Sequence, residues 1–481
     1  MELLNLIRVG LVLASAFLLL PLYATRRGDK WKSDWKELAA PVFLRTALFF
    51  QFTVVLLNQW KLCLPGIMAA IYFLWLLANA ALSYRARWIY DTQEWKLLWG
   101  RILRKLEGKG RKSVATRSAI SPQAVLTYVL ITFLVGRAAW FPLNNLRFFT
   151  QDSYSRALSL ETLLAGGSWT YDGSLTLLMP AAFWSGLDAA SVIRLSSPII
   201  LLALFLTIWN VNRTFGGSWR STFFTITTYW VSTSWLQLSP GAENSSRDLA
   251  SVFLLLAIAS LRTSYGYASC AMLMALLISP QLDGSLLCLL LAMLIGLIAD
   301  RILRNIPAGV AQPATAILLF AAGLSAIVAV EPRAEAVPLQ YEASARSVYE
   351  IATTYPRNQW SIVSPSSELA QIYGRGWHIQ LTDFVRDHSP VQSANPQFEF
   401  RYPTPHIFVF IEKKPLPNTA HALASNGVNT AYSYATKSGR IALEFEAAQI
   451  MAAYIKTHAN VNVFHEDEEL VVYHIEPKRR Q

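Results

Sequence analysis

Long apolar runs constrain this chain more than any other feature, because roughly 20 consecutive apolar residues are what a helix needs to cross a bilayer. Hydrophobic residues make up 53% of the 481 residues and charged residues 15%, against about 25% charged in soluble domains. The sequence therefore predicts a mainly α-helical, polytopic membrane protein with about ten transmembrane helices. The runs expected to span are residues 4–23, 40–57, 62–82, 124–141, 191–212, 221–238, 249–261, 265–279, 285–299 and 315–330.

Basic residues between the runs predict an orientation. The segment 84–121 contains ten Lys/Arg and three Asp/Glu, which gives a net charge of +7 (10 − 3). Cytoplasmic connections of membrane proteins are enriched in Lys and Arg. With 84–121 in the cytoplasm, the connection 142–190 and all residues after 330 fall outside. Because no eukaryotic retention signal is recognised, the expected location is the bacterial inner (plasma) membrane, with an extracytoplasmic (periplasmic) C-terminal domain.

The basic segment 84–121 also has helical periodicity. Trp95, Trp99 and Leu103 recur at helical spacing between lysines and arginines, a pattern typical of an amphipathic helix on an anionic membrane surface. The alternative is an arm that binds a partner or nucleic acid. We favour the membrane surface, so the net charge of +11 is assigned to lipid contacts and no nucleic-acid partner is expected.

The three cysteines, Cys63, Cys270 and Cys288, all fall within apolar runs. Cysteine in such a setting behaves as a small hydrophobic residue. Neither a disulfide framework nor a metal site is therefore predicted.

The connection 142–190 differs in kind from the other segments between the runs. Its charged residues are Arg147, Asp152, Arg156, Glu161, Asp172 and Asp188. Tyr154, Leu158, Glu161 and Leu164 form a helical pattern that predicts a helix along the membrane surface, and Glu161 and Asp172 are expected to be solvated. The hypothesis is that this connection carries the function and that the spans position it.

Residues 331–481 have the composition of a soluble domain. Strands are predicted at 360–363, 406–411, 461–464 and 470–475, and helices at 366–373 and 443–457. Strands that alternate with helices favour a small α/β domain. Its histidines are not paired at metal-ligand spacing and are interpreted as surface or structural residues.

Several short motifs follow one another in the central part of the chain. They are Asp152-x-Tyr154-x-Arg156-Ala157, Pro180-x-x-Phe183, Gly186, Arg194-Leu195, Ser239-Pro240 and the polar stretch from Glu243 to Asp248. In this order and sidedness, residues 122–330 resemble the integral-membrane glycosyltransferases of the GT-C superfamily, which includes the dolichyl-phosphate-mannose mannosyltransferases and the aminoarabinose transferases. The ending Val471-Val472-Tyr473 is similar to final strands in some members.

The resemblance implies transfer of a sugar from a polyprenyl-phosphate carrier to an acceptor outside the cytoplasm, usually with inversion. A carboxylate then takes the proton of the acceptor hydroxyl, and Asp152 is at the matching position. An arginine stabilises the departing lipid phosphate. Further acidic candidates are Glu243 and Asp248, and candidates for substrate binding are Tyr154, Arg156, Arg194 and Arg247.

Structural explanations compete with these roles. Asp152 is also a favourable N-cap for a helix that starts at Ser153, and Arg247 is also suited to an ion pair with Asp248. The sequence departs from the family because Asp152 has no close acidic neighbour, so no metal and no cofactor are expected. No Trp-Trp-Asp-Tyr-Gly motif occurs, which separates the chain from oligosaccharyltransferases.

The expected domains are N-terminal spans (1–83), a basic cytoplasmic segment (84–121), a GT-C-like core (122–330) and the extracytoplasmic domain (331–481). The first two lie outside the resemblance and suggest docking of a membrane-protein partner through residues 1–121. Other expected partners are membrane lipids, the polyprenyl-phosphate-linked donor, and a protein, lipid or glycan acceptor. Two other classes stay open: a catalytically silent GT-C-like scaffold of a membrane assembly, and a transporter of lipid-linked sugars.

Overall fold

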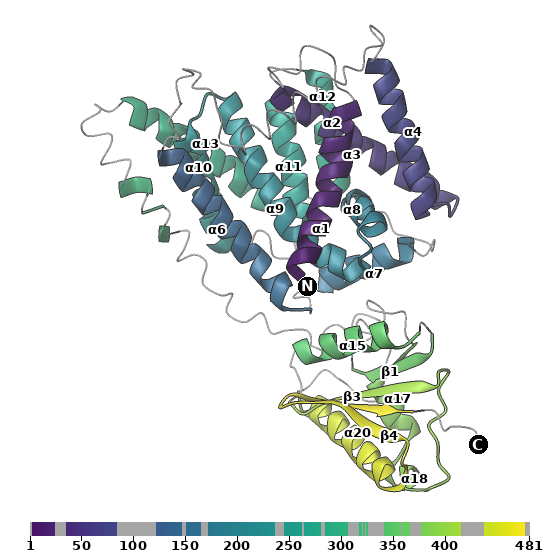
Figure 1. Ribbon diagram of the computed structural model, residues 1–481. Helices are drawn as coiled ribbons and strands as arrows, with labels where there is room; N and C mark the ends of the chain where they lie inside the picture. Colours follow the sequence, from purple (N-terminus) through teal and green to yellow (C-terminus); the bar gives the residue numbers. More distant parts are fainter. Residues whose placement is uncertain are drawn as a thin grey trace, which may run out of the picture.

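The chain folds into a helical bundle and a smaller C-terminal domain that contains a sheet (Figure 1). The computed structural model describes residues 2–24, 35–83, 122–146, 151–164, 172–235, 245–261, 264–279, 284–305, 317–319, 321–322, 324–325, 341–356, 358–365, 377–414 and 437–476. The predicted class, a mainly helical membrane-type protein with a small C-terminal sheet, is confirmed at this level.

Each of the first nine predicted runs contains a helix, whereas most of the tenth run and all of 84–121 lie outside the described residues. The bundle helices are α1 (Glu2–Ala14), α2 (Leu20–Ala24), α3 (Trp35–Gln59), α4 (Pro65–Ser83), α6 (Pro122–Asn144), α7 (Gln151–Leu164), α8 (Gly173–Trp184), α9 (Ala189–Thr214), α10 (Trp219–Trp235), α11 (Ser245–Ser260), α12 (Tyr265–Ile278) and α13 (Gly284–Asn305). A π-helical turn, η1 (Ser15–Leu19), joins α1 to α2.

Four helices in the described residues are long and apolar enough to cross a membrane. They are Glu2–Ala24, Ala39–Gln59, Pro122–Asn144 and Ala189–Thr214. Pro65–Ala81, Gly173–Trp184 and Tyr265–Ile278 are apolar but shorter. The structure therefore supports a helical membrane protein, with fewer spans of full length and hydropathy than the ten predicted.

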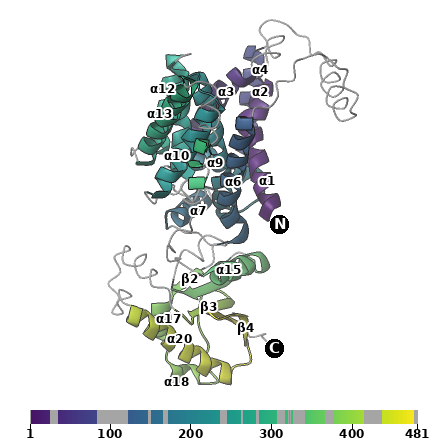
Figure 2. The same ribbon diagram turned by 90° about the vertical axis from the view of Figure 1, so that its left-hand side faces the viewer.

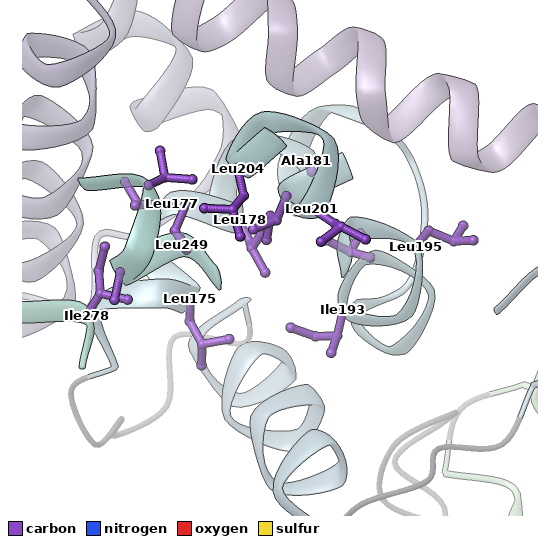
Figure 3. Packing of buried hydrophobic residues seen from close by; sticks show 14 of the residues in the cluster. Leu175, Leu177, Leu178, Ala181, Ile193, Leu195, Leu201, Leu204, Leu249 and Ile278 are labelled. Carbon is purple, nitrogen blue, oxygen red and sulfur yellow. The ribbon is translucent and has the colours of Figure 1, made fainter. Parts of the chain in front are cut away.

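The bundle core forms around α9 and α8. Helix α9 packs against α1, α6, α7, α10 and α11, and all residues from Gly173 to Ala182 of α8 are buried. Figure 3 shows leucines of α8 together with Leu201 and Leu204 of α9 and Leu249 of α11. Helix α8 is apolar on every side, which is typical of a fully buried helix.

Helix α8 shows that 142–190 is not a simple loop, because part of it is a buried helix of the bundle. With 12 residues, this helix is too short to be predicted as a transmembrane helix. The polar residues on either side of it are also typical of a loop. In the structure the hydroxyl of Thr176 donates to the carbonyl of Gly173 (2.8 Å), so this buried polar group is satisfied within the helix.

The N-terminal helices pack into the same bundle as residues 122–305. Helix α1 contacts α6, α8 and α9, and α3 contacts α8 and α12. Phe43 of α3 stacks on Phe253 of α11, with ring centroids 5.5 Å apart. Helix α4 lies beside α2, and Tyr72 donates a hydrogen bond to the carbonyl of Ala16 (2.6 Å). The predicted boundary at residue 83 is therefore not a break in packing for α1 and α3.

The C-terminal domain is a five-stranded sheet with the order β2-β1-β3-β5-β4. Its strands are β1 (Trp360–Ser364), β2 (Trp377–Gln380), β3 (His406–Glu412), β4 (Val461–Glu466) and β5 (Leu470–Ile475), and its helices are α15 (Glu342–Thr354), α17 (Leu381–Asp387), α18 (Pro390–Ser393) and α20 (Lys437–Thr457). Strand β1 runs parallel to β2 and β3, whereas β5 is antiparallel to β3 and β4.

Alternate side chains along the strands pack against helices on opposite faces of the sheet. Trp360, Ile362 and Phe408 belong to the apolar cluster that includes α15, whereas Val363 and Val409 pack with α17 and α20. Successive side chains of a strand point to opposite faces. Both views show α15 on the bundle side of the sheet and α17 and α20 on the other side (Figures 1 and 2).

Candidate functional site at the α7 end of the bundle

Helix α7 lies at the end of the bundle that faces the C-terminal domain (Figures 1 and 2). It begins at Gln151, so Asp152 and Tyr154 are in its first turn. The side chains of these two residues lie outside the described part of the structure. The predicted helix over 154–164 is thus present, and it starts three residues earlier than its pattern suggests.

The buried face of α7 differs from the predicted one. The pattern Tyr154, Leu158, Glu161 and Leu164 favoured a helix lying on the membrane surface. In the structure, Ala157, Leu160 and Leu163 are fully buried, and α7 packs against α8 and α9. The position of α7 along the membrane surface stays a prediction. Helix α7 has two possible apolar faces, because its apolar residues at i, i+3 and i+6 form a second stripe. The second stripe is the one that packs against α8 and α9.

Arg156 is the main polar residue on this buried face. Its guanidinium lies 3.5 Å from the carboxylate of Asp172 and donates to the hydroxyl of Ser174 (2.8 Å). The same carboxylate accepts hydrogen bonds from the amide (2.8 Å) and hydroxyl (2.6 Å) of Ser174. Asp172 is therefore the N-cap of α8 and not the solvated acid that the sequence suggested.

The start of α8 is also held from α3. Gln51 is buried, and its amide donates to the carbonyl of Gly173 (2.5 Å). Sequence reasoning missed Gln51, Asp172 and Ser174 as a connected group. Aspartate two residues before a serine, at the start of an apolar run, is an N-cap pattern that identifies Asp172 without a structure, whereas the contact with Gln51 depends on the fold.

Arg194 lies in the second turn of α9 and is buried. Its guanidinium pairs with Glu2 of α1 at 2.8 Å. It also donates to the carbonyls of Pro142 (2.7 Å) and Asn145 at the end of α6. Arg194 therefore ties three helices together. Asp188, the residue directly before α9, caps this helix by accepting a hydrogen bond from the amide of Ser191 (2.8 Å).

Helix α11 carries the second group of predicted residues. Asp248 is buried in its first turn, and Tyr229 of α10 lies 3.4 Å from its carboxylate. The neighbouring Arg247 is half-buried. Helix α11 packs against both α8 and α9. Glu243 lies outside the described residues.

Charge pairing limits what these arginines can do chemically. Asp172 already neutralises Arg156, and Glu2 neutralises Arg194, so a phosphate would have to displace a carboxylate from a buried partner. Separating a buried ion pair is costly. Arg247 is half-buried, so it is the most exposed of Arg156, Arg194 and Arg247.

Within the described residues no group of three or more His, Cys, Asp or Glu side chains is arranged to hold a metal. The side chain of Asp152 and the whole of Glu243 lie outside those residues, so the lack of a metal stays a prediction. Cys63 and Cys288 are buried and Cys270 is half-buried, and all three are free thiols. No protein-family model, curated protein or solved structure matches this chain.

Proposed function

We propose that this protein is a GT-C-like membrane glycosyltransferase, which transfers a sugar from a polyprenyl-phosphate carrier to an acceptor hydroxyl on the extracytoplasmic face. The observation that supports this most is the seating of α7, whose first turn holds Asp152. One turn later, Arg156 fixes the helix to the buried cap of α8 through Asp172. A catalytic group needs a rigid support of this kind.

In this proposal Asp152 is the general base. As the sugar carbon becomes cation-like, the attacking hydroxyl loses its proton, and a carboxylate within hydrogen-bond reach accepts it. Arg247 stabilises the charge that develops on the departing lipid phosphate. Glu243 and Asp248 orient the acceptor, and Tyr154 contacts the substrate. Arg156 and Arg194 act on the substrate only through the backbone that they hold.

The proposal includes ten spans. Helices α4, α10, α11, α12 and α13 would complete the set begun by the four long apolar helices, together with the run 315–330. One observation supports the expected sidedness. Glu2, Asn145 and Arg194 meet at one end of the bundle, whereas Arg304 donates to the carbonyl of Gly216 (2.9 Å), just after the end of α9. Basic residues at that second end fit a cytoplasmic face.

The Asp152→Asn variant tests the proposed base. Asparagine keeps the shape of aspartate but does not accept the hydroxyl proton, so we expect transfer to fall about a hundredfold or more. The measurement is release of free polyprenyl phosphate from a labelled polyprenyl-phosphate sugar, in membranes that contain each variant. Glu161→Gln, which removes a charge from the same helix, is the matched control and should retain wild-type release. Wild-type release by Asp152→Asn would move the base elsewhere, to Glu243 or Asp248 first.

A catalytically silent scaffold is the second candidate. It is favoured by one observation, that Arg156 and Arg194 both have carboxylate partners within the chain. The same assay separates the two functions, because a scaffold would release no polyprenyl phosphate with or without Asp152.

A further inference from the structure

The backbone that leads into α7 is held from two sides. We call residues 142–146 the entry segment, because α7 begins at Gln151 shortly after it. From the bundle, the buried guanidinium of Arg194 donates to the carbonyls of Pro142 and Asn145. Glu2 of α1 fixes that guanidinium at 2.8 Å. Carbonyl groups at the end of a helix have no partner within the helix, and Arg194 supplies one here.

The second hold comes from the C-terminal domain. Both carboxylate oxygens of Glu342, at the start of α15, accept the amide of Leu146, at 2.8 and 3.0 Å. Arg346 lies one turn further along α15 and donates to the carbonyl of Asn144 (3.4 Å). It also pairs with Glu342 at 3.0 Å, which keeps the carboxylate aimed at the entry segment.

Other observations place α15 close to the bundle. Val348 and Ile351 of α15 are fully buried and belong to the same apolar cluster as α9. Burial raises the pKa of Tyr349, and Asp188 and Glu2 of the bundle add to that rise. Helix α15 is therefore close to the starts of α1 and α9, and it also packs on the sheet through the strand residues Trp360 and Phe408.

We propose that Glu342 and Arg346 are positioning residues, through which the C-terminal domain sets the place of the first turn of α7 and hence of Asp152. This inference rests on the proposed function. Charged hydrogen bonds to backbone groups are stronger than neutral ones, and a misplacement of about 1 Å can cost a catalytic step roughly a hundredfold. The C-terminal domain is then part of the catalytic scaffold, joined to the bundle by these bonds.

The Glu342→Ala variant tests this role in the full-length protein. It removes both acceptors of the Leu146 amide, so hydrogen exchange of a peptide that covers 142–146 should become faster. Release of polyprenyl phosphate should fall about tenfold in kcat, with the KM for the donor unchanged. Glu342→Gln keeps one oxygen as acceptor and should restore most of kcat. Glu350→Gln, an exposed carboxylate on the same helix, should match the wild type in both measurements.

Three outcomes separate this inference from the proposed function. Unchanged hydrogen exchange of the entry segment in Glu342→Ala would overturn the inference alone. Faster exchange together with wild-type kcat would also overturn it, because the segment would be free without effect on catalysis. An inactive wild-type protein would overturn the proposed function, and the inference with it.

Discussion

At the scale of single residues, buried charges next to α7 are paired before any ligand arrives. Arg156 faces Asp172, and Arg194 faces Glu2. Removal of one member of a buried pair leaves the other without compensation, which is far more destabilising than the loss of a surface ion pair. Arg156 and Arg194 were predicted as phosphate ligands, and their placement favours a structural role for both.

Arg156→Ala distinguishes these roles for the first of the two arginines. Because the side chain of Asp172 is 27% exposed, we expect a loss of about 2–3 kcal/mol in the free energy of unfolding, below the full cost of a wholly buried pair. Urea unfolding of the purified protein in detergent measures it. The control is Arg386→Ala. The side chain of Arg386 is 59% exposed, so its removal should change the free energy of unfolding little. Unaltered stability with weakened donor use would instead make Arg156 a ligand of the phosphate.

At the scale of elements, the sequence predicts the strands other than β2 and describes the connection 142–190 poorly. The predicted helix over 366–373 lies outside the described residues. The alternation in 406–411 and 470–475 locates β3 and β5 because one face of each strand packs on a helix. Helix α8 is not predicted from the sequence, because the helices that bury it (α3, α9 and α11) include segments that are distant from it in the chain. The buried face of α7 is not predicted for the same reason, since packing against α8 and α9 determines which of its two apolar stripes is buried. The side chain of Asp152 lies outside the described residues.

The contact between α20 and β3 predicts a dependence of stability on pH. At the start of α20, Arg440 is buried between Glu444 (3.1 Å) and Glu412 (3.2 Å), and Glu444 also accepts the amide of Glu412 (3.0 Å). One guanidinium thus faces two carboxylates away from water. Burial, followed by the charge of Glu412, raises the pKa of Glu444 to about 8. Folded Glu444 therefore keeps its proton at pH values where the unfolded residue has lost it.

This proton sets the sign of the pH effect. The contribution of Glu444 is fully present below its ordinary pKa of about 4.5 and is lost as the pH rises toward about 8, on the order of a few kcal/mol. In Glu444→Gln the group is neutral throughout, so the decline between pH 5 and 8 should flatten. The measurement is the urea concentration at the midpoint of unfolding of the full-length protein. A fluorescent label on a cysteine placed at the exposed Ser389 monitors the unfolding. Glu446→Gln, an exposed neighbour on α20, should keep the wild-type slope. Equal slopes in Glu444→Gln and wild type would contradict the assignment.

At the scale of the whole molecule, three parts of the chain meet at one end of the bundle. They are the start of α1, the connection that contains α7, and α15 of the C-terminal domain, and both views show this arrangement (Figures 1 and 2). An ion pair between Arg194 and Glu2 and a hydrogen bond from the Leu146 amide to Glu342 join all three. Under the proposed function, the substrate would bind at this end, near Arg247 and the first turn of α7, and not at the opposite end near Arg304.

The most direct test of this account is the position of a lipid phosphate in an electron cryomicroscopy map of the Asp152→Asn variant with bound polyprenyl-phosphate sugar. We expect phosphate density at the bundle end that faces the C-terminal domain, within hydrogen-bond distance of Arg247 and with the sugar toward residue 152. Phosphate density at the opposite end, beside Arg304 and Gly216, would contradict both the proposed site and its sidedness.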